Sequence, residues 1–421
     1  MQFHAVFLYL LFTQFVPHMQ TAENNLSLAF QQWLHAAESS VDLCFYQITD
    51  PVIKDSLLAL HARGIQIRVI VDDDREYLLG PLVYAGIPVI SDTFGGNADF
   101  TMHDKFALRD VHDGDPANDA VWVGSWNATP YLHADNATEI YSHEVAQIFL
   151  AEFNQMWGSD SLIPNPGQAR FNVAKQPLWS DRQVIIGEDT LWIYFGPQDR
   201  PVDTLAAWVG RAQTSAEFLI YTFTHWGLRD SLLSLLARGG TVIGIFDSTM
   251  ASSDYSQYDE LLAGGAQVFI DPVPDPFYLL HHKVMILDER RLEFGSMNYT
   301  HSANTYNDEV AVFLAVGTST PQPGNGRSVV QRYHEEFLAR LAEVAPWAVQ
   351  ETPENGEQTW WIPAVVQDVI RLPSHGRYQI VDRVGRIVLQ GEGTRISIGS
   401  LPPGVYFLRQ GQRAVPFIRI P

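Results

Sequence analysis

The sequence predicts an α/β protein of two similar lobes, each a mixed sheet flanked by helices, related by a pseudo-twofold axis and followed by a small C-terminal β-sandwich. Three observations support this prediction. A long segment recurs once with its apolar positions preserved, and a short pattern of polar residues recurs behind each copy. Residues 373–421 then change to short β-rich runs separated by glycine and proline.

Composition places the chain among globular proteins with several domains. Its 421 residues include 46% hydrophobic and 12% aromatic side chains, enough to bury two or three cores. The formal charge is -21, from 27 basic and 48 acidic side chains, which disfavours unspecific binding to nucleic acid. The single cysteine, Cys44, excludes a disulfide within the chain and lies in an apolar run, as a buried unreactive thiol would.

The first 22 residues allow two interpretations. The run AVFLYLLFTQFV has the length of the apolar part of a signal peptide and is too short to span a bilayer, but no Lys or Arg precedes it. Alternatively, residues 8–12 are the counterpart of the strand-like run LWIYFGP at 191–197 and form the first strand of lobe 1. We favour the signal peptide and keep the strand as the alternative.

The long repeat defines both lobes. Residues 39–73 align without a gap on residues 214–248, so the offset is 175 positions (39 to 214). Each copy predicts an apolar strand, a helix with apolar residues three and four apart, and a second strand. Such a unit implies a right-handed crossover and parallel pairing. We expect lobe 1 over 23–172 and lobe 2 over 173–345.

The short repeat carries the chemistry. MHDKFALRD ends at Asp110 and LLHHKVMILD ends at Asp288, and both contain the pattern H-x-K-x4-D. In an extended strand residues i and i+2 share a face, so each His–Lys pair points one way. GSWN at 124–127 and GSMN at 295–298 then add a hydroxyl and an amide. Two facing lobes would bring these groups together around a tetrahedral phosphate. The predicted site comprises His103, Lys105, Ser125, Asn127, His281, Lys283, Ser296 and Asn298.

Two such motifs inside a duplication resemble the phospholipase D superfamily, whose members carry this signature, and the resemblance spans about residues 25–345. It implies a phosphodiesterase that needs no metal and no cofactor. One histidine attacks phosphorus, while the other protonates the leaving alcohol and then activates water. By that precedent His103 is the nucleophile and His281 the general acid, and the lysines and asparagines of both motifs surround the phosphate.

Four acidic residues are supporting candidates. Asp110 and Asp288 end their strands, where a turn-forming role is more plausible than a catalytic one. The family places a glutamate eleven residues after the asparagine of G-S-x-N, bonded to the catalytic imidazole, and Glu309 holds that place. In lobe 1 the eleventh residue is Thr138, so Glu139 would reach the site only through a one-residue bulge.

The part of the chain after residue 345 differs from the lobes. Residues 346–372 include VQETPENGEQ and read as a polar linker. In residues 373–421, VDRVGR and LPPGVYFLR resemble the C-terminal sorting domain of the type IX secretion system, with an Ig-like accessory or carbohydrate-binding module as the alternative. The resemblance implies a secreted or cell-surface protein that contacts the secretion machinery, which favours a signal peptide.

Two substrate classes fit the predicted site. The segments before the histidines, SDTFGGNADFTM and DPVPDPFYLL, are aromatic and contain no Lys or Arg, which suits acyl chains better than a polyanion. We therefore predict a secreted phospholipase D-type phosphodiesterase that cleaves phospholipid head groups. A metal-independent endonuclease acting on DNA or RNA is the alternative. We expect a monomer, because both motifs lie in one chain.

Overall fold

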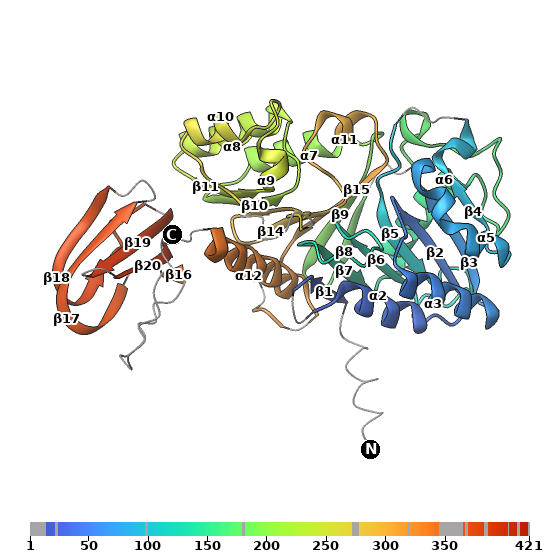
Figure 1. Ribbon diagram of the computed structural model, residues 1–421, viewed down its shortest axis with the longest axis horizontal. Coiled ribbons are helices and arrows are strands. Elements are labelled where there is room, and N and C mark those ends of the chain that lie inside the picture. The colour runs from blue at the N-terminus through green and yellow to red at the C-terminus, as the bar shows by residue number, and fades with distance from the viewer. Residues whose placement is uncertain are drawn as a thin grey trace, which may run out of the picture.

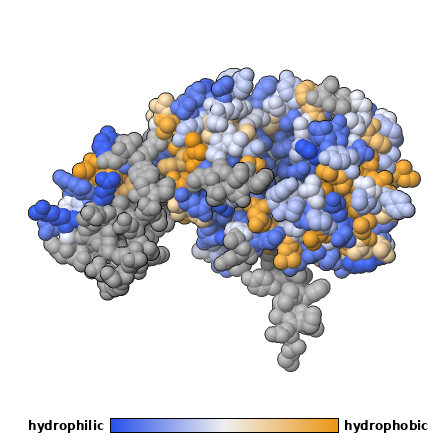
Figure 2. Space-filling view, viewed as in Figure 1, coloured by the Kyte–Doolittle hydropathy of each residue, from blue (hydrophilic) through white to orange (hydrophobic). Residues whose placement is uncertain are grey.

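The computed structural model describes residues 14–419, apart from 22–23, 97–99, 179–181, 272–277, 319, 323, 345–364, 367–368, 383–385, 403 and 411–412. Two lobes lie side by side, blue to green and green to orange in Figure 1, with a C-terminal sheet in red at one end. The predicted α/β class and its duplicated architecture are confirmed. The face in Figure 2 is mostly hydrophilic, with apolar residues in small groups.

Lobe 1 is built on a seven-stranded sheet in the order β1-β7-β6-β5-β2-β3-β4. Strands β2, β3 and β4 are parallel to one another, and the other pairings are antiparallel. The strands are β1 (Phe15–Met19), β2 (Ser40–Phe45), β3 (Gln66–Val71), β4 (Val89–Ser91), β5 (Lys105–Arg109), β6 (Ala120–Gly124) and β7 (Asn136–Ile140). The α-helices are α2 (Leu26–His35), α3 (Pro51–Ala62), α4 (Asp73–Glu76), α5 (Gly80–Tyr84) and α6 (His143–Trp157).

Lobe 2 repeats this plan with one more strand, in the order β12-β11-β10-β13-β14-β15-β9-β8. Its strands are β8 (Gln183–Ile186), β9 (Asp189–Gly196), β10 (Ser215–Ile220), β11 (Thr241–Phe246), β12 (Gln267–Ile270), β13 (Lys283–Leu287), β14 (Arg291–Gly295) and β15 (Glu309–Ala315). Its α-helices are α7 (Pro201–Gly210), α8 (Trp226–Ala237), α9 (Ser248–Ala251), α10 (Tyr258–Ala263), α11 (His301–Thr305) and α12 (Gly326–Val344).

The repeat predicted from the sequence is the core of both sheets. Strands β2 and β10 pair in parallel with β3 and β11 respectively, across helices α3 and α8. The side chain of Asp50 accepts the Val52 amide at 2.9 Å and so starts α3. Both helices stop where a glycine adopts a left-handed conformation, with φ of 89° at Gly64 and 90° at Gly239.

The two sheets enclose a central apolar layer to which α6 and α12 contribute. On the outer faces, α2 and α3 cover the lobe 1 sheet and α7 and α8 cover the lobe 2 sheet. Trp157 and Cys44 are both fully buried in the central layer. Burial raises the pKa of the Cys44 thiol well above its usual range, which agrees with an unreactive cysteine.

The N-terminal region contributes a strand to lobe 1. Strand β1 pairs antiparallel with β7 at the sheet edge, just as β9 pairs with β15 in lobe 2. The C-terminal boundary of the predicted leader, 1–22, therefore lies too far along the chain, because residues 15–19 form a strand of lobe 1. The alternative strand at 8–12 lies outside the described residues, and a signal peptide before Phe15 stays a prediction. Within the described part of the chain, every helix is too short or too polar to cross a bilayer.

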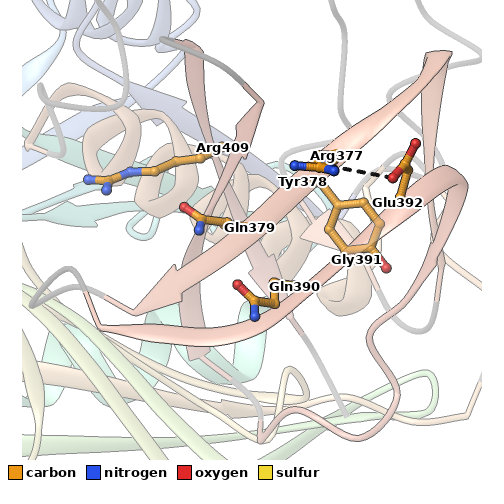
Figure 3. A pocket seen from close by; sticks show the side chains of 7 residues that line it. All are labelled: Arg377, Tyr378, Gln379, Gln390, Gly391, Glu392 and Arg409. Carbon is orange, nitrogen blue, oxygen red and sulfur yellow. Dashed lines mark ion pairs between the residues drawn. The ribbon is translucent and has the colours of Figure 1, made fainter.

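The C-terminal unit is a five-stranded sheet in the order β16-β20-β19-β17-β18, with its own apolar cluster. Its strands are β16 (Val365–Val366), β17 (Val369–Asp382), β18 (Ile387–Ser397), β19 (Gly404–Gln410) and β20 (Arg413–Arg419). The sheet begins within the range predicted as a linker, 346–372. A cavity of about 610 Å³ lies on β17, β18 and β19 and contains none of the predicted site residues (Figure 3).

Candidate active site

The two His–Lys pairs lie at the start of equivalent strands. Strand β5 begins at Lys105 and β13 at Lys283, so each histidine stands two residues before its strand rather than within it. The Lys105 ammonium donates to the backbone oxygen of His103 at 2.6 Å, and Lys283 donates to that of His281 at 2.5 Å. These bonds fix each lysine beside its histidine.

Backbone contacts bring the two motifs together across the lobes. The His103 amide donates to the carbonyl of Asp308 in lobe 2 at 2.9 Å. In the same way the His281 amide donates to the carbonyl of Ala134 in lobe 1 at 2.9 Å. Each histidine segment is therefore docked on the opposite lobe, and the convergence expected from the sequence is present.

Each imidazole is also held by a carboxylate of the opposite lobe. Nδ1 of His103 lies 2.9 Å from both carboxylate oxygens of Glu309, the first residue of β15. Nδ1 of His281 lies 2.8 Å from Oδ1 of Asp135, the residue before β7. An ionised carboxylate can only accept, so with Asp135 and Glu309 both ionised Nδ1 carries the proton in both rings and Nε2 is left for chemistry.

Glu139 does not reach the site, so the expectation for this residue was wrong. It lies four residues along β7 from Asp135, and its Oε1 is 2.7 Å from Nε2 of His18. The Tyr141 hydroxyl donates to its other oxygen. The strand stays regular here, without the bulge that would have turned Glu139 toward the imidazole.

Asp135 is the residue that the sequence reasoning missed. The register pairs Gly124 with Ala137 and Gly295 with Ala311, so Asp135 and Glu309 occupy equivalent positions. Asp135 comes eight residues after Asn127, whereas Glu309 comes eleven after Asn298. A gapped comparison of DNAT with EVAV would have found it.

Both serines hold the carboxylates. Ser125 donates to Asp135 at 2.7 Å, and Ser296 donates to Glu309 at 2.5 Å. The preceding glycines make room for this contact, because a Cβ at Gly124 or Gly295 would lie 2.2 Å from a backbone oxygen of the next strand. The serines thus orient the carboxylates, in place of the direct contact with phosphate expected from the sequence.

The asparagines have unused amides. The Oδ1 atoms of Asn127 and Asn298 are buried, and neither amide has a side-chain hydrogen bond among the described residues. An amide N–H donates well to a phosphate oxygen. The two residues therefore fit the predicted role at the phosphate.

Asp110 and Asp288 are turn residues away from the imidazoles. Asp110 has a φ of 64° and accepts the backbone amides of Glu38, Ser39 and Ser40 at 2.9, 2.7 and 3.2 Å. Asp288, with a φ of 53°, accepts the amide of Thr214 at 2.8 Å in the same manner. The structural role favoured for both residues agrees with this geometry.

Two tyrosines complete the site and were not predicted. The ring of Tyr46 lies 5.5 Å from the ring of His103 and 5.5 Å from the Lys105 ammonium. Tyr221 lies 5.2 Å from both His281 and the ammonium of its lysine. The tyrosines occupy matching places in the ungapped repeat, which was the available signal.

Electrostatics keep both imidazoles neutral at pH 7. Burial and the charge of the lysines lower the pKa of His103 well below its usual range and that of His281 to about 3. Burial likewise lowers the pKa of Lys105 to about 8 and of Lys283 to about 7. At pH 7 the site therefore offers two neutral imidazoles beside a mostly charged Lys105 and a half-charged Lys283, and the charge of these lysines suits an anionic phosphodiester.

The two carboxylates differ. Burial raises the pKa of Glu309 to about 8, despite the nearby lysines. Burial also opposes ionisation of Asp135, but the contact with His281 and the charge of Lys283 outweigh it and lower its pKa. His281 thus faces the more strongly ionised of the two carboxylates.

Three carboxylates beside the site have oxygens within 4.8 Å of one another: Asp72, Asp73 and Asp92. Asp72 accepts the backbone amide of Met102 at 3.1 Å. Asp247, its counterpart in lobe 2, makes the same bond to Leu280 at 3.1 Å. The role of Asp72 in holding the histidine segment explains this residue without a metal ion.

Comparisons with known proteins agree with this geometry. Residues 30–157 and 205–340, one segment in each lobe, match the family model described as "Cardiolipin synthase, PLD-like domain". The chain is 32% identical over 149 residues to the mitochondrial cardiolipin hydrolase of Homo sapiens, covering 34% of this chain and 53% of that protein. It is 25% identical over 138 residues to a phospholipase D of Rickettsia felis, covering 33% of this chain and 62% of that protein.

The chain thus spans about half the length of the first of these relatives. Among solved structures, phosphatidylserine synthase of Haemophilus influenzae shares the fold with a TM-score of 0.55 at 12% identity, over 81% of this chain and 90% of the other. The family model matches more than half of the chain and covers both histidine motifs. The chain belongs to the family of cardiolipin synthase-type, phospholipase D-like domains.

Proposed function

We propose that the protein is a phospholipase D-type phosphodiesterase that cleaves phospholipid head groups through a phosphohistidine. The observation that carries this proposal is the pair of imidazoles, each with Nδ1 held by a carboxylate and Nε2 free, beside two lysines. Such a pair provides one nucleophile and one acid, which a double displacement at phosphorus requires.

In the first step the Nε2 lone pair of His103 forms a bond to phosphorus, and the bond from phosphorus to the head-group oxygen breaks. His281 gives its Nε2 proton to that oxygen. The negative charge of the bound phosphodiester offsets the two lysines, which raises the pKa of His281 and prepares it as the acid. Substrate binding therefore supplies the protonation state that the free site disfavours.

In the second step water attacks phosphorus and the bond from phosphorus to His103 breaks. His281, now neutral, takes the proton from the water at Nε2. The products are phosphatidate and the head-group alcohol, and both imidazoles return to their starting state. The lysines and the amides of Asn127 and Asn298 hold the phosphate oxygens through both steps.

A phospholipid is the proposed substrate, with nucleic acid as the alternative. The names of the relatives, a cardiolipin hydrolase and a phospholipase D, support a lipid. The net charge of -21 disfavours a polyanion. The loops before the histidines, to which the sequence assigns the acyl chains, lie partly outside the described residues.

The test incubates the purified protein with phosphatidylcholine vesicles and with plasmid DNA in parallel, with a chelator present. We expect release of choline and intact DNA. His103→Ala should lose at least about 10³ in turnover, because the nucleophile is missing. Cleavage of DNA without choline release would favour the nuclease, and loss of activity with the chelator would exclude a metal-free scheme.

Trapping tests the intermediate itself. His281→Ala should still be attacked on a diester with a p-nitrophenyl leaving group, which needs little protonation. Its phosphohistidine should then accumulate, because no base remains to activate water, and should appear on His103 by mass spectrometry. An unmodified His103 despite a burst of p-nitrophenol would contradict the covalent scheme.

We also propose that the protein is secreted and acts as a monomer. The resemblance of the C-terminal residues to a sorting domain supports export, and the presence of both motifs in one chain supports the monomer. If a leader is removed, protein recovered from the culture medium should lack Met1 and begin no later than Phe15, the first residue of β1, as N-terminal sequencing would show. Retention of the full-length chain in the cells would contradict this proposal.

A further inference from the structure

The end of each sheet that lies next to the histidines also carries exposed apolar side chains. In lobe 1 the parallel strands β2 and β3 end at this edge, as does β6, and the loops that follow lead to the site. Strands β10, β11 and β14 do the same in lobe 2. Exposed apolar residues in the segments that follow these strands include Tyr77 (75%), Tyr131 (54%), Leu132 (62%), Tyr255 (77%) and, as the first residue of α8, Trp226 (67%).

Tyr131 and Leu132 are adjacent in the loop between β6 and β7, which leads directly to Asp135 and the catalytic pair. The ring of Tyr131 stacks on His133 at 5.5 Å, and His133 lies 6.2 Å from the ring of His281. The following residue, Ala134, is bonded to the His281 backbone. This exposed pair is therefore coupled to one side of the active site through two ring contacts and the backbone.

Three of these segments contain no cationic side chain, whereas the segment that bears Tyr77 contains Arg75, whose guanidinium lies 5.2 Å from the ring of Tyr46 in the site. Segments 125–135, 221–227 and 252–257 have neither Lys nor Arg. A surface that binds nucleic acid or an anionic membrane needs such cations, and the net charge of -21 opposes both partners further. Exposed Tyr, Trp and Leu without cations match instead the interfacial region of a zwitterionic bilayer, where aromatic rings are favoured.

We propose that the loop bearing Tyr131 and Leu132 inserts into the surface of zwitterionic phospholipid and brings the His281 side of the site to the phosphate layer. Trp226 and Tyr255 contact the same surface from lobe 2. The choice of a lipid partner rests on the proposed function, but the insertion is a separate property. It accounts for apolar side chains that the catalytic scheme does not use.

The test compares two double variants of the full chain, and a thermal melt checks their folding. Tyr131→Ser with Leu132→Ser removes the proposed anchor. Leu162→Ser with Ile163→Ser is the matched control, because this exposed pair lies in the loop after α6 beside Ser161, which contacts Arg68 near the opposite end of β3. Flotation with phosphatidylcholine vesicles measures binding, and hydrolysis is followed on vesicles and on a short-chain phosphatidylcholine dissolved as monomers.

The anchor variant should bind vesicles about ten- to a hundredfold more weakly, the effect of losing one or two buried apolar side chains. It should lose activity on vesicles in proportion and keep that on monomers within about twofold. Unchanged vesicle binding by the anchor variant, or an equal loss of vesicle binding in the control variant, would overturn the proposal. So would an anchor variant that binds vesicles normally but has lost binding to single-stranded DNA, measured in parallel. A wild type that binds vesicles but hydrolyses neither lipid would contradict the proposed function and leave the anchor standing.

Discussion

At the residue scale, the most informative finding is that Asp135 in lobe 1 holds the imidazole of lobe 2. Asp135→Asn keeps the size of the side chain and removes the charge that stabilises a protonated His281. We expect a loss of about 10- to 100-fold in kcat, as for other orienting carboxylates. The loss should be large for alkyl leaving groups and small for p-nitrophenol, because only the former need the acid.

Asp110→Asn is the control for this substitution, because Asp110 is likewise a buried aspartate of lobe 1 but accepts the backbone amides of a turn. It should leave the leaving-group dependence unchanged. An Asp135→Asn variant that loses the same factor on both kinds of substrate would indicate a structural role for this carboxylate.

The pKa values of the two lysines predict how the affinity for a phosphodiester depends on pH. Both have lowered pKa values, about 8 for Lys105 and about 7 for Lys283, so each is charged below its value and neutral above it. The affinity for a phosphodiester should therefore be highest below pH 7 and fall as the pH rises through 7 and 8. Titrating an unreactive diester such as dimethyl phosphate at pH 5.5 to 9 measures this fall.

The variant Lys283→Arg distinguishes the contributions of the two lysines to this pH dependence, because a guanidinium keeps its charge throughout this pH range. In this variant the fall should shift toward pH 8, the value of the remaining lysine. A wild-type affinity that stays constant from pH 5.5 to 9 would show that the lysines do not bind the phosphate as cations.

At the scale of the elements, a buried ion cluster joins the lobes beneath the site. The Lys175 ammonium lies 2.6 Å from Glu152 of α6 and 2.8 Å from Asp308, and all three are fully buried. The backbone oxygen of Asp308 holds His103. The cluster therefore connects α6, the segment between the lobes and the nucleophile.

Lys175→Met should lower the free energy of unfolding by about 3–5 kcal/mol, because it leaves two buried carboxylates without a cation. Urea unfolding measures this change. Lys175→Met combined with Glu152→Gln should recover part of the loss, since one uncompensated charge is then removed. A single variant as stable as the wild type would mean that the carboxylates are neutral in the folded protein.

The sequence predicted the elements whose signals are local. The unit of β2, α3 and β3 and its copy were recognised because apolar spacing acts within a few residues. Strand β1 was not, because FVPHM is short, contains proline and alternates poorly at a sheet edge. The partner of His281 was missed for a different reason, since a shorter loop displaces Asp135 along the sequence while leaving it in place in space.

At the scale of the whole molecule, the C-terminal sheet lies apart from the histidines. Its strands and cavity contain no residue of the site, although Val381 and Phe407 belong to the same apolar cluster as lobe 2. A chain that ends at Trp347 should therefore keep its specific activity on a monomeric lipid within about twofold, the usual scale of surface changes. The sorting hypothesis adds that this chain should not be exported from its native host.

Steady-state kinetics of the purified truncated chain test the first expectation, and immunoblots of medium and cells test the second. A folded truncated protein with little activity would make the sheet part of the catalytic unit. Normal export of the truncated protein would leave the sheet without a sorting role.

Because each lobe supplies the carboxylate that orients the histidine of the other lobe, the smallest complete site is the pair of lobes and not the single lobe. A lobe separated from its partner would contain a histidine without its acceptor and a carboxylate without its donor. The chain behaves in this respect as a dimer fused into one polypeptide. A substitution of the carboxylate in one lobe is therefore expected to impair the histidine of the other lobe.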